Sequence, residues 1–139
     1  MHHSDHRGFT PLELIIIVGI LGVIMLVALP PMSRFIRSNR LAGSTTTVAG
    51  DLRYARSLAS TQRRNYEFRS TTTGYSIVSV TPASTVLTRS LQPGVQFTAV
   101  SDTAHFDAFG PTQSKVFTLQ KDGHSRVVSM NSNGQVTCD

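Results

Sequence analysis

Three residues in the second half of the chain have the types and spacing of a small acid–base or metal site. His105 lies three residues after Asp102 and two before Asp107, so its imidazole could act as a general base or a ligand beside an orienting carboxylate. The same residues are ordinary in a surface loop, and no second cluster in the sequence completes a site. We therefore predict that the chain is not an enzyme and uses no cofactor or metal.

Glu13 is the other residue whose chemistry stands out, because it lies at the start of an apolar run. Residues 14–29 contain no charged or strongly polar side chain, and counted from Phe9 the run is about as long as a membrane span. A carboxylate at membrane depth is costly, so it indicates a function and a partner. An acid that simply reaches up to the membrane surface is the alternative.

The element that carries this acid is predicted to be an apolar, membrane-spanning helix over residues 9–31. At about 1.5 Å per residue it would reach roughly 30 Å. Pro30 and Pro31 are predicted to end or kink it. A cleaved secretory signal peptide is the competing interpretation, but prolines follow the apolar run where small residues would be expected.

Residues 32–65 are predicted to form the amphipathic second half of the helix. Apolar or small side chains recur every three or four residues, which predicts one buried face. Its members are Met32, Phe35, Ile36, Ala42, Thr45, Val48, Ala49, Leu52, Ala55, Leu58 and Ala59. Most arginines fall on other faces and indicate a solvated, basic side. Gly43 and Gly50 each weaken the helix by roughly 1 kcal/mol, so a sheet is expected to support it.

Residues 66–139 are predicted to form a domain of short antiparallel strands. The candidate strands are residues 66–70, 75–81, 86–90, 95–100, 115–120, 125–130 and 135–138. Predicted turns are Thr73-Gly74, Pro82-Ala83, Pro93-Gly94, Gly110-Pro111, Asp122-Gly123 and Asn133-Gly134. Of these, Asp122-Gly123 is the clearest hairpin signal.

Two stretches resemble a known family. Gly8-Phe9-Thr10-Pro11-Leu12-Glu13, followed by the apolar run, resembles the class III signal of type IV pilins and type II secretion pseudopilins, usually G-F-T-L-I-E. Residues 51–68, DLRYARSLASTQRRNYEF, are similar to the L-x-x-A-R-S-x-A-x-x-R segment of the GspH/FimT group of minor pilins and pseudopilins. Pro11 stands where the family usually has leucine, and proline is tolerated in a first helical turn.

The resemblance implies a fold, a processing route and a set of partners. The fold is α+β and pilin-like, with a long N-terminal helix whose apolar half is transmembrane and whose second half packs on an antiparallel β-sandwich. A prepilin peptidase would remove residues 1–8 by cutting after Gly8 on the cytoplasmic side, and would methylate Phe9. The histidines of the leader, which resemble a metal-binding tract, would leave with it; they are His2, His3 and His6.

The resemblance also gives Glu13 a role in assembly. The new amine of Phe9 would pair with Glu13 of a neighbouring subunit, since a buried charge is tolerable only when paired. The chain is then expected as a single-pass inner-membrane protein with a periplasmic C-terminal domain, and afterwards as part of a pilus or pseudopilus. Its expected role is a minor pilin or pseudopilin subunit of a type II secretion system or type IV pilus, in the filament or its tip or initiation complex.

DNA uptake is the competing function. The formal net charge of +5 suits DNA, anionic lipid or an acidic protein face, and solubility alone also explains it. Some FimT-like proteins bind DNA through a C-terminal G-R-x-R motif, and the matching positions here are Gln135 and Thr137, which carry no charge. A weaker DNA candidate is Lys121, His124 and Arg126, which also read as a solvated hairpin tip. The single cysteine, Cys138, cannot form an intrachain disulfide.

Overall fold

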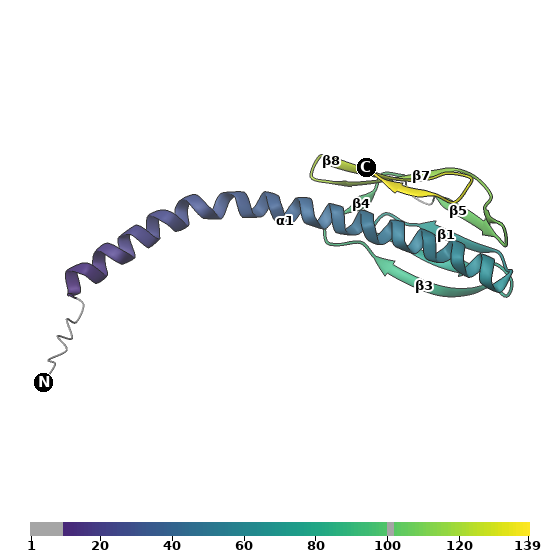
Figure 1. The fold of residues 1–139 in the computed structure, drawn as a ribbon, viewed down its shortest axis with the longest axis horizontal. Helices are drawn as coiled ribbons and strands as arrows, with labels where there is room; N and C mark the ends of the chain where they lie inside the picture. Colours follow the sequence, from purple (N-terminus) through teal and green to yellow (C-terminus); the bar gives the residue numbers. More distant parts are fainter. Residues whose placement is uncertain (1–9, 100–101) are drawn as a thin grey trace, which may run out of the picture. The chain divides into compact units, whose positions relative to one another are not determined.

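The structure, a computed structural model, describes residues 10–99 and 102–139, apart from the side chains of residues 27–34 and 37. The chain divides into two compact units, Met1–Ile36 and Arg37–Asp139, and one helix, α1 (Pro11–Gln62), contributes residues to both. In the described part, α1 is followed by β1 (Tyr66–Ser70), β2 (Gly74–Ser79), β3 (Ser84–Ser90), β4 (Gln96–Phe97), β5 (Thr103–Asp107), β6 (Gly110–Pro111), β7 (Lys115–Lys121), β8 (His124–Met130) and β9 (Val136–Cys138) (Figure 1).

A threonine caps the start of α1. Thr10 Oγ1 accepts a hydrogen bond from the backbone N–H of Glu13 at 3.3 Å, and the Thr10 carbonyl accepts one from Leu14 N–H, also at 3.3 Å. A threonine cap satisfies an N–H that has no partner within the helix. Pro11 occupies the first helical position, where its missing donor costs nothing. The structure thus places Pro11 where the sequence predicts that proline is tolerated.

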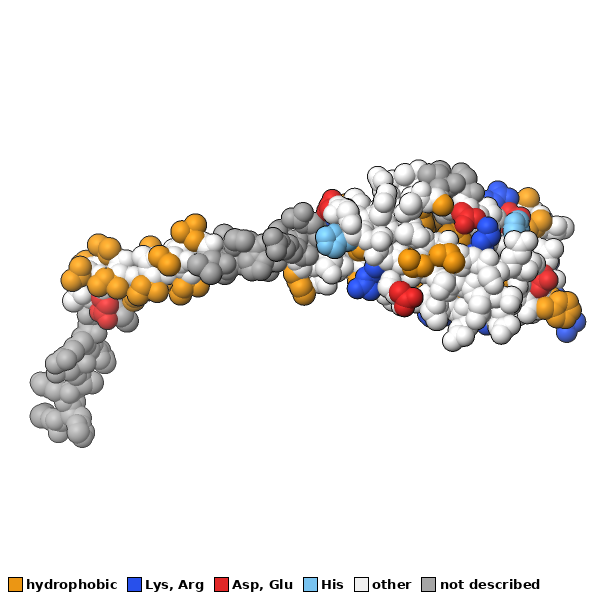
Figure 2. Space-filling view, turned by 90° about the horizontal axis from the view of Figure 1, so that it is seen from above, with side chains coloured by type: hydrophobic (Ala, Val, Ile, Leu, Met, Phe, Trp, Pro, Cys, Tyr) orange, Lys and Arg blue, Asp and Glu red, His pale blue; other side chains and the backbone are white. Residues whose placement is uncertain are grey.

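The first unit exposes the apolar side chains of α1 (Figure 2). Between Leu12 and Leu26 the exposed fractions of the large apolar side chains run from 41% at Ile17 to 76% at Leu26. An apolar surface this continuous indicates contact with other apolar material. Within residues 10–99 and 102–139, no helix combines the length and the apolar character needed to cross a membrane.

Pro30 and Pro31 are predicted to end or kink the helix; α1 continues through both, so the predicted end is wrong and the kink stays a prediction. Each proline removes one backbone donor and crowds the preceding turn. Its fixed φ of about −65° nevertheless lies in the helical region, so helix can form on both sides of it. The hydrogen bonds of the surrounding turns are enough to carry the helix across this point.

The second half of α1 buries most of the predicted face. The buried members are Thr45, Val48, Ala49, Leu52, Ala55 and Ala59. Leu41 joins them, although it was not predicted. Phe35 and Ile36 were predicted on the same face and are exposed, because they belong to the first unit, in which the described residues contain no strand.

Three consecutive threonines of α1 bond to their own helix. Thr45, Thr46 and Thr47 donate from Oγ1 to the carbonyl oxygens four residues earlier, at 2.8, 3.1 and 2.9 Å. Such bonds let a hydroxyl sit on a helix with its hydrogen bond already made. Only Thr45 is buried in the core of its unit, and the other two are exposed.

α1 ends in a hydrogen-bonded turn. Arg63 has a φ of +50°, and the N–H of Arg64 bonds to the carbonyl oxygen of Ala59 at 3.3 Å. This is the bond from the second residue beyond the cap to the third-last helical residue, which defines a Schellman motif. Its left-handed position usually holds glycine and here holds an arginine.

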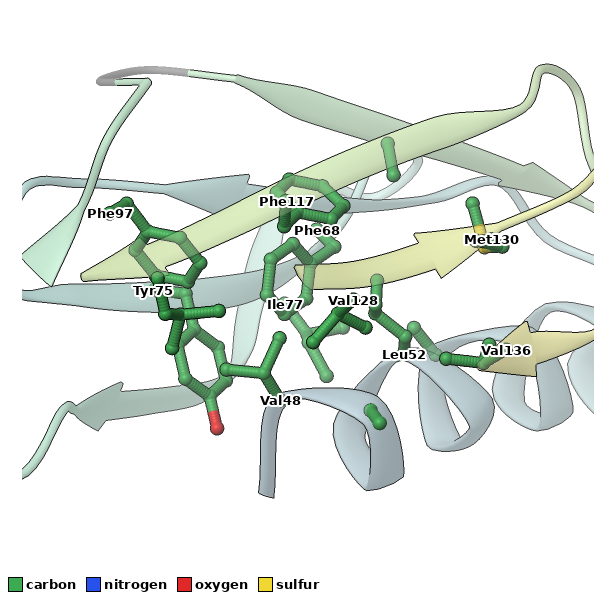
Figure 3. Close-up of a cluster of buried hydrophobic side chains, with 14 of the residues drawn as sticks. Val48, Leu52, Phe68, Tyr75, Ile77, Phe97, Phe117, Val128, Met130 and Val136 are labelled. Atoms are coloured by element: carbon green, nitrogen blue, oxygen red, sulfur yellow. The ribbon is translucent and has the colours of Figure 1, made fainter. Parts of the chain in front are cut away.

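In residues 10–99 and 102–139, nine antiparallel strands form two sheets that share one core with α1. The first sheet has the order β3-β2-β1-β5-β6 and the second β4-β7-β8-β9. Aromatic rings join the sheets: Phe68 and Phe117 have centroids 5.2 Å apart, and Tyr75 and Phe97 6.3 Å apart. Figure 3 shows these rings with Val48 and Leu52 of α1. The predicted α+β fold, a long helix on antiparallel sheets, is confirmed.

The strand predictions hold best where side chains alternate. Residues 66–70 form β1 with the predicted bounds, and Asp122-Gly123 has φ values of +49° and +80°, as its hairpin turn requires. β5 was not predicted. Gly110-Pro111, predicted as a turn, is strand β6, and the turn lies at residues 108–109.

Candidate functional sites

Glu13 is the only assembly or processing candidate that the structure describes, since Gly8 and Phe9 lie outside the described residues, as do the leader histidines. Its side chain is exposed in the first turn of α1. Thr10 caps its N–H, and the Thr-x-x-Glu spacing is that of a capping box. A carboxylate also interacts favourably with a helix N-terminus. Glu13 therefore has a local stabilising role, signalled by the Thr10 spacing in the sequence.

The C-terminal segment is fastened to α1 by two arginines. Arg53 Nη2 donates to the carbonyl oxygen of Val136 at 2.8 Å, and Arg56 Nη1 donates to that of Gly134 at 3.0 Å. Gly134 is buried with a φ of +77°, and a Cβ there would lie 2.5 Å from Arg56 Cζ. The predicted solvated, basic side of α1 is therefore incomplete, because two of its arginines hold the segment that follows β8.

A surface hollow of about 490 Å³ lies beside this contact. Its lining is Arg53, Arg56, Ser57, Ser60 and Gly134. The four helical residues follow the spacing i, i+3, i+4, i+7, which places them on one face of α1. The sequence shows this spacing, but the docked segment that completes the hollow comes from about 80 residues later in the chain.

Two of the three predicted DNA contacts are exposed. Lys121 is 9% exposed, and its ammonium donates to the carbonyl oxygen of Pro93 at 2.8 Å. His124 is exposed, with Nδ1 3.2 Å from the carbonyl oxygen of Asp122. Arg126 is exposed on β8. The Lys121 side chain thus joins the end of β7 to the turn that precedes β4.

His105, Asp102 and Asp107 do not form one site. Asp102 Oδ1 accepts from Lys115 Nζ at 2.6 Å, whereas His105 Nδ1 lies 3.2 Å from Glu67 Oε1. These two contacts are separate, and strand β5 lies where a loop was predicted. Among the described residues, no group of three or more histidine, cysteine, aspartate or glutamate side chains could hold a metal ion.

Asp107 stabilises the turn between β5 and β6. Its Oδ1 accepts the N–H groups of Phe109 at 2.8 Å and Gly110 at 3.0 Å. Phe109, at the tip of that turn, is 96% exposed. The aspartate therefore fixes a turn that presents an aromatic side chain to solvent.

A buried polar cluster ties α1 to β2 and β3. Tyr75 Oη donates to Asp51 Oδ2 at 2.7 Å, and Arg89 Nε lies 2.9 Å from the same oxygen. Burial raises the pKa of the Tyr75 phenol, and the hydrogen bond to the Asp51 carboxylate raises it further. The cluster satisfies a carboxylate on the core side of the helix, so its role is in the fold.

Comparison with known proteins identifies the fold and family. The family model described as type II transport protein GspH matches residues 44–134, more than half of the chain. The type IV minor pilin FimU of Pseudomonas aeruginosa, a solved structure, is similar in fold with a TM-score of 0.63 at 20% identity. The match covers 76% of this chain and 92% of that one. No curated protein matches the chain.

Proposed function

Because the chain belongs to the GspH family and is a GspH/FimT-like minor pilin, we propose that it is a subunit of a type II secretion or type IV pilus filament, or of its tip or initiation complex. The observation that carries the proposal is the family match over residues 44–134 together with the pilin-like fold. A filament role also gives the exposed apolar side chains of the first unit a use, since packing against other subunits would remove them from water.

Processing and membrane insertion belong to the same proposal. A prepilin peptidase cuts between Gly8 and Phe9 and methylates the new terminus. The precursor lies in the inner membrane as a single-pass protein with its β domain in the periplasm. The motif around Gly8 and the apolar run over residues 9–29 of the sequence support both steps.

Replacement of Gly8 by a bulky residue tests the processing step. Gly8→Phe should leave the longer precursor in the membrane fraction, because the peptidase needs a small residue before the cut. Arg7→Gln changes the neighbouring position and should be processed normally. An immunoblot of membrane fractions separates the two sizes, and mature protein of normal size from Gly8→Phe would refute the proposed cut.

Glu13→Gln tests the role of the carboxylate in assembly. The variant should enter the membrane but should be depleted from sheared filaments, because an amide cannot pair with the amine of a neighbouring Phe9. Thr10→Val is the matched control: it removes the capping hydroxyl that binds the Glu13 N–H and keeps the carboxylate. Equal depletion of both variants from filaments would mean that the start of the helix is responsible, and would refute the proposed pairing of Glu13 with Phe9.

A DNA receptor for uptake is the competing function, favoured by the exposed Arg126 and His124 and by the net charge of +5. Against it stand the uncharged Gln135 and Thr137 and the engaged Lys121. A gel shift of the full chain in detergent with duplex DNA at two salt concentrations tests it. Salt-dependent binding that Arg126→Gln abolishes would favour the receptor, and no binding at low salt would exclude it.

A further inference from the structure

The face of α1 formed by Arg53, Arg56, Ser57 and Ser60, here called the arginine face, has two cations without an acidic partner. Within the described residues, neither guanidinium lies within 4.0 Å of a carboxylate, whereas Arg69 pairs with Glu67 and Arg89 with Asp51. Arg63 and Arg64 follow within one turn, are exposed, and likewise show no carboxylate within that distance in the part that the structure describes. The last turns of the helix and the two residues after it therefore carry four arginines that pair with no carboxylate in the described part of the chain.

The arginine face is held in place before any ligand arrives. Each guanidinium has five N–H donors in a planar fork. Arg53 and Arg56 each use one donor on a backbone carbonyl of the C-terminal segment. Both arginines line the hollow of about 490 Å³ together with Ser57 and Ser60. A guanidinium that one hydrogen bond already holds in place loses little conformational entropy when its other N–H groups bind an oxyanion, and this favours binding.

Three of the chain's described acids are not available to fill this hollow on a second copy, because Asp51, Glu67 and Asp102 are each in an ion pair with a basic side chain of the same chain. Glu13, Asp122 and Asp139 are exposed. The net charge of +5 also makes two copies repel. A different chain with unpaired carboxylates would be attracted to this surface, and its carboxylates would pair with the guanidinium groups of Arg53 and Arg56.

We propose that the arginine face binds carboxylate side chains of an acidic segment on a different subunit of the same filament. The inference rests on the proposed function and names the chemistry of the neighbour. A glutamate or aspartate that enters the hollow would meet two guanidinium groups, each with donors left for a charge-assisted hydrogen bond to a carboxylate oxygen. Ser57 and Ser60 offer hydroxyl donors to the oxygens that the arginines leave free.

The size of the surface favours a protein partner over nucleic acid. Duplex DNA presents continuous rows of phosphates, and strong binding neutralises many of them at once. The hollow presents two guanidiniums, which match one or two carboxylates. Single acidic side chains that project from a protein surface can enter a hollow of this volume, whereas a duplex backbone requires a longer positive surface.

The test measures binding of a fluorescent ten-residue polyglutamate peptide to the full chain in detergent by anisotropy. Arg53→Gln and Arg56→Gln should each weaken binding by about fivefold, the range of a partly exposed ion pair. Arg126→Gln removes the same charge from β8 and should leave the affinity unchanged. No binding of the peptide, or an equal loss with Arg126→Gln, would overturn the inference.

Three further measurements distinguish the possible outcomes. Ser60→Glu puts an acid into the hollow without touching the bonds from Arg53 and Arg56 to the C-terminal segment, so it should abolish peptide binding while the melting temperature is unchanged. A duplex oligonucleotide that binds more tightly than the peptide, and is lost with the same arginine variants, would assign the face to nucleic acid. Incorporation into filaments is measured separately. Absence of the wild-type chain from filaments would refute the proposed function, whereas the peptide and oligonucleotide measurements decide the inference about the arginine face.

Discussion

Arg56 and Gly134 lie 78 positions apart in the chain and meet in one close contact. The guanidinium donates to the Gly134 carbonyl at 3.0 Å, and the space of a Cβ on Gly134 is filled by the guanidinium itself. Arg56 belongs to the helix segment that resembles the GspH/FimT group, and Gly134 to the segment matched to the DNA-binding motif. A helix residue thus sets which residue the C-terminal segment can carry at this point.

Gly134→Ala should destabilise the protein more than Gly123→Ala. Both glycines have positive φ, +77° and +80°, so both substitutions strain the backbone by about 1 kcal/mol. Only the alanine at 134 also collides with Arg56, whereas nothing lies within 4 Å of a Cβ at 123. The colliding atoms are the end of the flexible Arg56 side chain, so we expect an additional loss of at most about 1 kcal/mol in the free energy of unfolding, the contribution of the hydrogen bond from Arg56 to the Gly134 carbonyl, measured by urea titration. Equal losses would show that Arg56 moves aside freely.

Tyr75→Phe should reduce the loss of stability at alkaline pH, measured as the free energy of unfolding against pH. The folded protein raises the pKa of the Tyr75 phenol, so the neutral phenol is favoured in the fold. This stabilisation is complete below the unfolded pKa of about 10 and is lost as the pH rises above it. The free energy of unfolding of the wild type should fall more steeply above pH ~10, by at most about 1.4 kcal/mol per pH unit. Parallel curves for the two proteins would contradict a raised pKa of the buried Tyr75 phenol.

Arg63→Gly should stabilise the protein. Arg63 holds the left-handed position of the Schellman turn at a φ of +50°, which strains a residue with a Cβ. Glycine relieves that strain at some entropic cost, for a net gain of roughly 0.5 kcal/mol. Arg64→Gly removes the same side chain from the next position and should bring no gain. Thermal melting compares the three proteins, and a lower melting temperature for Arg63→Gly would mean that its side chain makes a contact of its own.

Ser70→Ala should destabilise the protein and Ser79→Ala should not, although both serines are buried in the first sheet. The Ser79 hydroxyl is buried without a hydrogen-bond partner among the described residues, so its removal should be neutral or stabilising by about 1 kcal/mol. Ser70 Oγ donates to the Asp102 carbonyl at 3.0 Å and accepts from the Asp102 N–H at 3.1 Å. Ser70→Ala should therefore cost about 1 to 2 kcal/mol. Chemical denaturation of both variants checks the sign.

Local patterns in the sequence predicted most of the fold. β1 alternates buried and exposed side chains, and its bounds were predicted correctly. β5 alternates in the same way, with Ala104 and Phe106 buried. Its outward positions hold Thr103, His105 and Asp107, and this polar composition made the strand read as a loop. The polar composition of β5 thus outweighed its alternating pattern in the sequence-based prediction.

The site could be predicted only in part, because its contacts are non-local. The Thr10-x-x-Glu13 spacing is visible in the sequence and corresponds to the observed cap. The bonds from Arg53 and Arg56 to the C-terminal segment span about 80 residues, and no periodicity signals them. Lys121 was grouped with a basic hairpin tip, whereas its side chain turns back to the Pro93 carbonyl.

The threonines at positions 46 and 47 change what α1 presents to its surroundings. Their hydroxyls are committed to the carbonyl oxygens of Ala42 and Gly43. What remains for a neighbour is largely the methyl group, so this turn offers a surface closer to valine than to serine. A helix from another subunit could dehydrate it without breaking a hydrogen bond, which makes a segment that is polar in composition suitable for a dry interface.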